Sequence, residues 1–159
     1  MESEPKQNKS PDNIPTLRSA TADDAQFLFD VKIEAMSKVH ESLHPGEPID
    51  MEKEFKEYMK KFEPGKVSVI EYEGKAVGRL RVVRTDESIY VGGLQILPEY
   101  QQKGIGDAIF KDLMEESDRT HKPIITEIHH VNTININWKR KLGFKEIASN
   151  DKQVTMRYN

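Results

Sequence analysis

Residues 94–106, LQILPEYQQKGIG, decide the fold of this chain. The stretch predicts a strand that ends at Pro98, a short loop, and a helix that opens at Gly104-Ile105-Gly106. The first turn of a helix leaves N–H groups unpaired, and glycines remove the Cβ atoms that would keep an anion away from them. Lys103 adds positive charge there, so the segment is suited to a pyrophosphate. Taken alone, the G-x-G spacing is also compatible with a turn that needs glycine only for its shape.

Hydrophobic periodicity and turn residues predict a mixed α/β order on both sides of this stretch. Helices are expected at residues 21–40, 51–62, 104–119 and 133–142. Strands are expected at residues 16–19, 66–72, 76–84, 89–97, 123–129, 144–148 and 153–157. Glu73-Gly74 predicts a tight hairpin turn, and Gly92-Gly93 inside a strand predicts a bulge or the close approach of another group.

Composition limits the function classes. The chain has 159 residues, of which the polar segment 1–13 is expected to be a disordered tail and 14–159 a single domain. Its 24 Lys and Arg against 27 Asp and Glu give a net charge of −3, which argues against a nucleic-acid partner. No apolar stretch approaches the ~20 residues of a membrane span, and no signal peptide is recognisable. With no cysteine, the chain is expected to be cytoplasmic, without a thiolate metal site or cysteine nucleophile.

Several motifs occur in the order found in one family. Gln101–Gly106 resembles the Q/R-x-x-G-x-G/A signature of the GCN5-related N-acetyltransferase (GNAT) superfamily, and the preceding Leu94–Tyr100 is similar to that family's strand and its Pro-Glu-Tyr lead-in. Asn132 and the run Lys141–Phe144 match its late asparagine and its K-L-G-F helix end. The resemblance implies an α/β (α+β) fold. It has a mixed, mostly antiparallel central sheet of six to seven strands, flanked by about four helices and splayed at the cofactor cleft.

The resemblance also implies acetyl-CoA as co-substrate, bound without a metal between the strands at 89–97 and 123–129. The backbone of Leu94, Gln95 and Ile96 would pair with the pantetheine arm, the N–H groups of residues 102–107 would hold the pyrophosphate, and Asn132 would reach the arm. The residues expected to contact the cofactor are Leu94, Gln95, Ile96, Gln101, Gln102, Lys103, Gly104, Ile105, Gly106, Asp107, Asn132, Asn137 and Trp138.

An amine acceptor must lose a proton before it attacks a thioester, which costs about 4.6 kcal/mol at pH 7 for a pKa of ~10.4. A carboxylate or histidine beside the amine can accept that proton. Glu127 is the first candidate, five residues before Asn132 on the strand that faces the expected cleft. His129 shares its strand face by period two and is the alternative base. A Glu127 paired with a neighbouring lysine would be the merely structural alternative.

The acid that protonates the departing thiolate is not assigned by the sequence. Many relatives have a tyrosine four residues before the final glycine, whereas this chain has Lys139, beside Trp138. Lysine can donate a proton, but Lys139-Arg140-Lys141 is also an ordinary composition for a helix C-terminus. Asn137, Trp138, Tyr158 or water remain alternatives at this position.

These features predict an acetyl-CoA-dependent N-acetyltransferase that moves acetyl directly to a primary amine of a small molecule or peptide. The alternative is a non-catalytic acyl-CoA-binding or regulatory module of the same fold, which the missing tyrosine favours. The connection at residues 40–50 is expected to shape the acceptor pocket, where Glu41 and Glu47 would favour cationic acceptors. A homodimer is the first assembly to test, because two-fold dimers are the commonest soluble oligomers.

Overall fold

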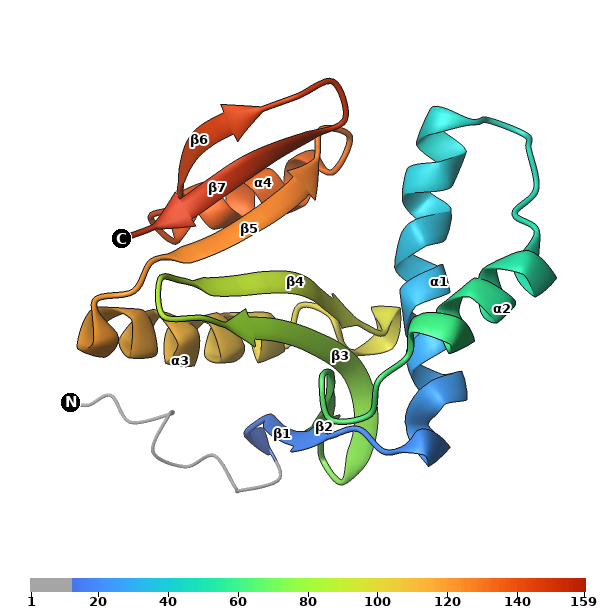
Figure 1. The fold of residues 1–159 in the computed structure, drawn as a ribbon, viewed down its shortest axis with the longest axis horizontal. Coiled ribbons are helices and arrows are strands. Elements are labelled where there is room, and N and C mark those ends of the chain that lie inside the picture. Colours follow the sequence, from blue (N-terminus) through green and yellow to red (C-terminus); the bar gives the residue numbers. More distant parts are fainter. Residues whose placement is uncertain (1–12) are drawn as a thin grey trace.

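The computed structural model describes residues 13–159 (Figure 1). The expected tail at 1–13 therefore lies outside the described residues, except for Asn13. The helices are α1 (Ala25–Leu43), α2 (Met51–Lys61), α3 (Ile105–Thr120) and α4 (Thr133–Lys141), with short 3-10 turns η3 (Ala22–Asp24) and η4 (Pro98–Tyr100). The strands are β1 (Thr16–Ser19), β2 (Ser68–Tyr72), β3 (Lys75–Arg84), β4 (Ile89–Ile96), β5 (Ile124–His129), β6 (Lys145–Ser149) and β7 (Gln153–Tyr158).

The strands form one sheet in the order β1-β2-β3-β4-β5-β7-β6. All neighbours are antiparallel except β4 and β5, which run parallel. The parallel pair needs a crossover, which α3 provides. Within residues 13–159, four helices and a mixed, mostly antiparallel seven-stranded sheet confirm the predicted fold class.

Helices cover both faces of the sheet. Successive residues of a strand point to opposite faces, and the neighbours Val69 and Ile70 of β2 belong to two different buried clusters. Ile70 packs in the larger cluster, which α3 and α4 complete with residues such as Phe110 and Ile136. Val69 packs in the smaller cluster with Leu28 of α1. α3 and α4 therefore share one face, and α1 and α2 lie on the other (Figure 1).

Local signals in the sequence account for most element ends. The Asp24 carboxylate accepts the Thr21 N–H at 2.8 Å and caps the turn that leads into α1. It also accepts two bonds from Arg18, and these bonds hold the pKa of Asp24 well below its usual range. α1, predicted to end at residue 40, continues to Leu43 because the first helix-breaking residue is Pro45.

The hairpin turn predicted between residues 72 and 75 is also confirmed. Glu73 and Gly74 both have positive φ, 54° and 76°, as a two-residue turn between twisted strands requires. At the other end of the chain, Gly143 adopts φ 103° just after α4, as predicted for a helix-terminating glycine. Among residues 13–159, no helix combines the length and apolar composition that a bilayer crossing requires.

Candidate active site

β4 and β5 separate in the middle of the sheet. They pair only from Ile89–Val91 to Ile124–Thr126, although both strands continue beyond this point. At the last pair, the Thr126 hydroxyl donates to the Val91 carbonyl at 3.1 Å, in place of a further main-chain bond. Figure 1 shows the two strands diverging from here toward α1. The opening between β4 and β5, called the split below, is where the sequence placed the cofactor cleft.

A β-bulge lies at the same point. Gly93 pairs with Arg81 and Val91 with Val82, so Gly92 is an extra residue on β4. A bulge bends its strand and increases its twist, which helps to turn β4 away from β5. The bulge predicted from Gly92-Gly93 is confirmed. A Cβ at Gly92 would collide with the end of the exposed Arg81 side chain and lie 3.2 Å from the Tyr90 ring, so a larger residue here would displace Arg81.

The β4 edge that lines the split carries main-chain groups without strand partners. The Leu97 N–H donates to the Val77 carbonyl of β3 at 2.8 Å. Main-chain groups alternate in direction along an antiparallel strand, so those of Gln95 also face β3, whereas those of Leu94 and Ile96 face the split. The Ile96 carbonyl accepts a bond of 2.9 Å from the Gln101 side chain, which fastens the following loop to the end of β4.

The loop that follows β4 has the main-chain geometry that the predicted anion cradle needs. Gln102 and Gly104 both have positive φ, 63° and 82°, and Gly104 is the N-cap of α3 without a capping side chain. A Cβ at Gly104 would meet nothing within 4 Å, so the space in front of the helix is open. The N–H groups of Ile105 and its successors face that space with the positive end of the helix dipole. Lys103 is exposed beside them, and these groups fit a pyrophosphate.

α4 packs against the start of α3. The Trp138 indole donates to the Asp107 carboxylate at 2.6 Å, and its ring lies 3.1 Å from where a Cβ at Gly106 would be. The Asn132 side chain caps α4 by accepting the Asn135 N–H at 3.3 Å. Trp138 on α4 and Asp107 at the start of α3 were both predicted to bind the cofactor, and this contact brings them together. The third residue predicted on α4, Asn137, is exposed.

Lys139 is buried, with 3% of its surface exposed. Its ammonium donates to the Asn135 side-chain oxygen at 2.7 Å and lies 4.4 Å and 4.0 Å from the centres of the Phe110 and Trp138 rings. Burial lowers the pKa of Lys139 from 10.5 to about 7. A lysine in this state holds and releases a proton near neutral pH.

Glu127 lies at the mouth of the split. Continuing the register of β4 and β5 places it opposite Gly92, one residue beyond the last pair. The Tyr90 hydroxyl donates to Glu127 Oε1 at 2.8 Å. Burial and the adjacent carboxylate raise the pKa of Tyr90, so the hydroxyl remains a donor. His129 lies two residues further along β5, on the same face and half-buried.

Sequence reasoning missed Tyr90 as a partner of Glu127. The only available signal was the alternation of β4, which places Tyr90 on the opposite face from the buried Ile89 and Val91. The register of β4 with β5 could not be predicted from the sequence. Tyr158, left open as an acid, lies elsewhere, because its hydroxyl donates to Asp118 near the end of α3, at 3.1 Å. It is therefore not a candidate for the proton transfer.

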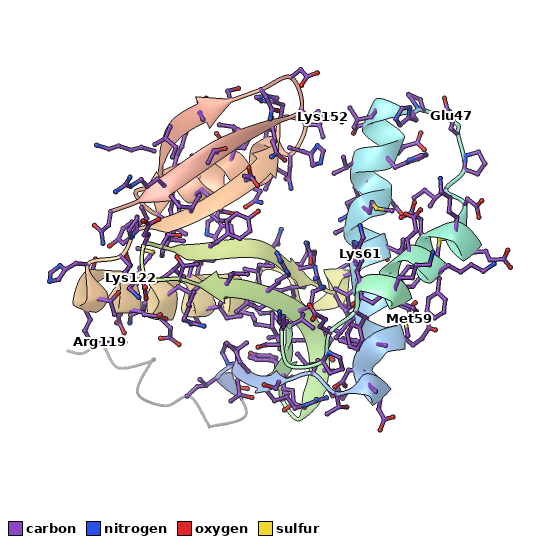
Figure 2. The ribbon with its side chains drawn as sticks, in the orientation of Figure 1. Glu47, Met59, Lys61, Arg119, Lys122 and Lys152 are labelled. Carbon is purple, nitrogen blue, oxygen red and sulfur yellow. The ribbon has the colours of Figure 1, made fainter. Side chains whose placement is uncertain are left out.

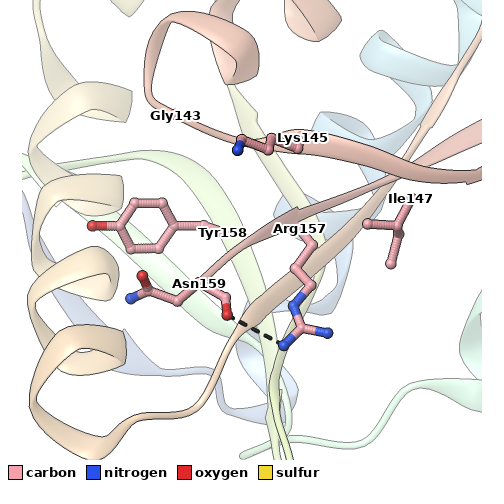
Figure 3. Close-up of a pocket in the computed structure, with 6 residues that line it drawn as sticks. All are labelled: Gly143, Lys145, Ile147, Arg157, Tyr158 and Asn159. Atoms are coloured by element: carbon pink, nitrogen blue, oxygen red, sulfur yellow. Dashed lines mark hydrogen bonds between the residues drawn. The ribbon is translucent and has the colours of Figure 1, made fainter.

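Two surface hollows lie away from the split. One, of about 370 Å³, is formed beside the outer strands β6 and β7 (Figure 3). It is lined by Gly143, Lys145, Ile147, Arg157, Tyr158 and Asn159. The other adjoins the C-terminal end of α3. Tyr158, one of the alternative acids, lines the hollow beside β6 and β7, and the other predicted site residues line neither hollow. Within residues 13–159, no group of three or more His, Asp and Glu side chains is arranged to hold a metal ion.

The mixed sheet of this chain is split between β4 and β5, and the glycine-capped helix α3 begins at that split. These two features together are typical of the acetyltransferase class of α/β proteins. The family model described as "Acetyltransferase (GNAT) domain" matches residues 63–146, and the chain belongs to this family. The sequence-based recognition of the GNAT superfamily is thereby confirmed. No curated protein sequence matches the chain.

Solved structures share the fold over nearly the whole chain. The PaiA N-acetyltransferase from Thermoplasma acidophilum, in complex with coenzyme A, has a TM-score of 0.74 at 16% identity, covering 91% of this chain and 98% of its own. YncA from Salmonella typhimurium, with its cofactor acetyl-CoA, has a TM-score of 0.56 at 19% identity, covering 91% and 93%. The ribosomal-protein-S18-alanine N-acetyltransferase from Escherichia coli has a TM-score of 0.60 at 18% identity, covering 91% and 92%. At these identities the likeness shows the shared fold.

Proposed function

We propose that residues 14–159 form an N-acetyltransferase domain that moves acetyl from acetyl-CoA directly to a primary amine of a small molecule or peptide. The observation that carries the proposal is the position of Glu127, opposite Gly92 where β4 and β5 separate, with one carboxylate oxygen bound by Tyr90. Family membership and the relatives solved with coenzyme A or acetyl-CoA support the donor. The absence of cysteine from the chain fits a direct transfer.

The chain offers two surfaces to the donor, which supplies the thioester when bound. The free main-chain edge at Leu94 and Ile96 is suited to pair with the amides of the pantetheine arm, in the manner of an added strand. The N–H groups at the start of α3, with Lys103, are suited to the pyrophosphate. Three residues on α4 or at its start are proposed to border the pantetheine arm: Asn132, Asn137 and Trp138.

Glu127 is the proposed base. Its Oε1 accepts the Tyr90 hydroxyl, so Oε2 remains to accept a proton from the ammonium form of the acceptor. Tyr90 is a positioning residue, because its hydroxyl fixes the carboxylate that receives the proton. His129 shares this face of β5 and remains the alternative base. A group close to the amine lowers the roughly 4.6 kcal/mol cost of deprotonating it at pH 7.

Lys139 is the proposed acid. A pKa of about 7 leaves it partly protonated at neutral pH, so it can donate a proton to the departing sulfur. Its contact with Trp138, which also touches Asp107 at the start of α3, places the ammonium between the two helices that border the split. A lysine can therefore replace the phenol that many relatives have here.

Substitution of Glu127 by glutamine tests the base. We expect Glu127→Gln to lower kcat/KM by about 100-fold in a coenzyme A release assay, the usual range for a general base. Coenzyme A binding by calorimetry should be unchanged. Glu146→Gln, an exposed carboxylate on β6, is the matched control and should keep full activity. Full activity in Glu127→Gln with loss in His129→Gln would move the role to His129, and full activity in both would refute a side-chain base on β5.

One observation favours the second candidate, a non-catalytic acyl-CoA-binding module. The tyrosine typical of the family is replaced by Lys139, and this lysine is enclosed. Coenzyme A binding without coenzyme A release over a broad panel of amines would establish the binding module and overturn the enzyme.

A further inference from the structure

The face of the sheet that carries Glu127 also carries an enclosed guanidinium. Arg79, on β3, is only 8% exposed. Its Nη1 donates to the side-chain oxygen of Gln95, on β4, at 2.6 Å, and its Nε is enclosed without a hydrogen-bond partner. Nη2 has no partner within residues 13–159 either and, unlike Nε, is not completely enclosed.

No acidic side chain balances this charge. Within residues 13–159, no carboxylate lies within ion-pair distance of Arg79. The charged groups that act on it are the Tyr58 hydroxyl and a second cation, Arg81, and burial lowers the pKa of Arg79. Removing a guanidinium from water without a counter-charge is costly, and such groups are uncommon unless a ligand supplies the partner.

Arg79 and Arg81 adjoin the predicted reaction centre. Nη1 of Arg79 lies 3.0 Å from where a Cβ at Gly93 would be, and the Arg81 guanidinium lies over Gly92. The Tyr90 ring is the other neighbour of Gly92, and its hydroxyl holds Glu127. The guanidinia therefore lie on β3 and the base on β5, with β4 between them. Two strand spacings are roughly 10 Å. The separation of β4 from β5 makes the backbone distance to Glu127 longer than this, and an acceptor has to bridge it.

The other charges on this side are mixed in sign: Glu54 and Glu57 of α2 raise the pKa of Lys32, whereas Lys61 lowers it. Lys32 of α1 is half-buried with its ammonium 5.3 Å from the centre of the Tyr58 ring, and the charge of Arg79 helps to lower the pKa of Lys32, after burial. Glu41 and Glu47, which the sequence suggested as attractors of cationic acceptors, are exposed at the end of α1 and in its connection to α2. Figure 2 shows Glu47 on that outer connection. Among residues 13–159, the buried charge on this face of the sheet is that of Arg79, and it is positive.

We propose that Arg79, assisted by Arg81, binds a carboxylate of the acceptor, so that the acceptor is an amino acid or short peptide whose amine reaches Glu127. This inference rests on the proposed acetyltransferase function and names its acceptor class. A guanidinium fork matches a carboxylate with two parallel N–H bonds, which a lysine cannot reproduce.

The test compares amines that differ only in the carboxylate: L-lysine with cadaverine, L-ornithine with putrescine, and glycylglycine with its amide. We expect the wild type to prefer the carboxylate member of at least one pair about tenfold or more in kcat/KM. Arg79→Gln should abolish that preference by raising KM for the carboxylate acceptor alone, and Arg79→Lys should restore it in part. Coenzyme A binding should be unchanged in both variants.

A wild type that favours the carboxylate-free member of every pair, or neither, would overturn the inference, as would a folded Arg79→Gln that keeps the preference. If Arg79→Gln does not fold, Arg81→Gln, at an exposed position, is expected to lower the preference several-fold, and an unchanged preference would count against the proposal. If no amine is acetylated, the proposed function fails separately. Calorimetry on coenzyme A-loaded protein then still tests the carboxylate site: N-acetyl-L-lysine should bind, and N-acetylcadaverine should not.

Discussion

Replacing Lys139 by methionine removes a buried charge while keeping a side chain of similar length. Burial lowers the pKa of Lys139 from 10.5 to about 7. At about 1.36 kcal/mol per pKa unit, the protonated lysine destabilises the fold by about 5 kcal/mol below pH 7. The bond to the Asn135 oxygen and the contacts with two aromatic rings offset part of this cost. We therefore expect Lys139→Met to be more stable than the wild type at pH 7.

The sign of the pH dependence follows from proton binding. Between pH 7 and 10.5 the unfolded chain keeps the proton on Lys139 and the folded chain loses it, so the stability of the wild type rises with pH. This group alone should add about 2 kcal/mol between pH 7 and pH 9. The methionine variant lacks the contribution, so its advantage over the wild type should shrink by the same amount.

Urea unfolding at pH 7 and pH 9 measures both free energies. Lys141→Met, at an exposed position of the same helix, is the control and should differ from the wild type by at most about 0.5 kcal/mol at both pH values. An advantage of Lys139→Met that stays constant between the two pH values would refute the titration of Lys139 in this range. Lys139 would then not be the proton donor at neutral pH.

Three further substitutions test the fold and the cradle. Gly78→Ala would push a Cβ into the main-chain oxygen of Gln95, and should lower the unfolding free energy by about 2–3 kcal/mol, measured with urea. Gly106→Ala would displace the Trp138 ring, so we expect a shift in tryptophan fluorescence, with Trp138 the single tryptophan, and several-fold weaker coenzyme A binding by calorimetry. Asp24→Asn should cost about 1 kcal/mol at pH 7. Because the folded-state pKa of Asp24 is lowered, unfolding curves of this variant and the wild type should converge as pH falls below about 3.9.

The sequence predicted every α-helix and strand of residues 13–159, because the residues that end these elements act locally, whereas the 3-10 turn η4 was predicted as a loop. Glycine or its neighbours specify the main chain at three such places: the turn at Glu73-Gly74, the bulge at Gly92 and the end of α4 before Gly143. The unpaired N–H groups at the start of α3 were predictable for the same reason, because a glycine N-cap has no side chain that could accept them.

Contacts between distant strands could not be predicted in this way. The bond from Tyr90 to Glu127 depends on the register of two parallel strands joined by a helix, which no local pattern specifies. The burial of Lys139 and Arg79 could not be predicted for another reason: a charged side chain in a polar stretch is normally solvated, so its burial becomes visible only in the packed structure. The most informative charges of the candidate site were therefore those that the sequence presents as ordinary.

The separation of β4 from β5 gives this sheet an additional edge, located in its interior. Exposed strand edges are templates for intermolecular pairing, and proteins normally protect them. Here the protection would come from whatever extended molecule fills the gap, so the empty form should be the one that self-associates on storage. Adding a ligand that lies along Leu94–Ile96 should then slow the growth of light scattering, independently of any turnover.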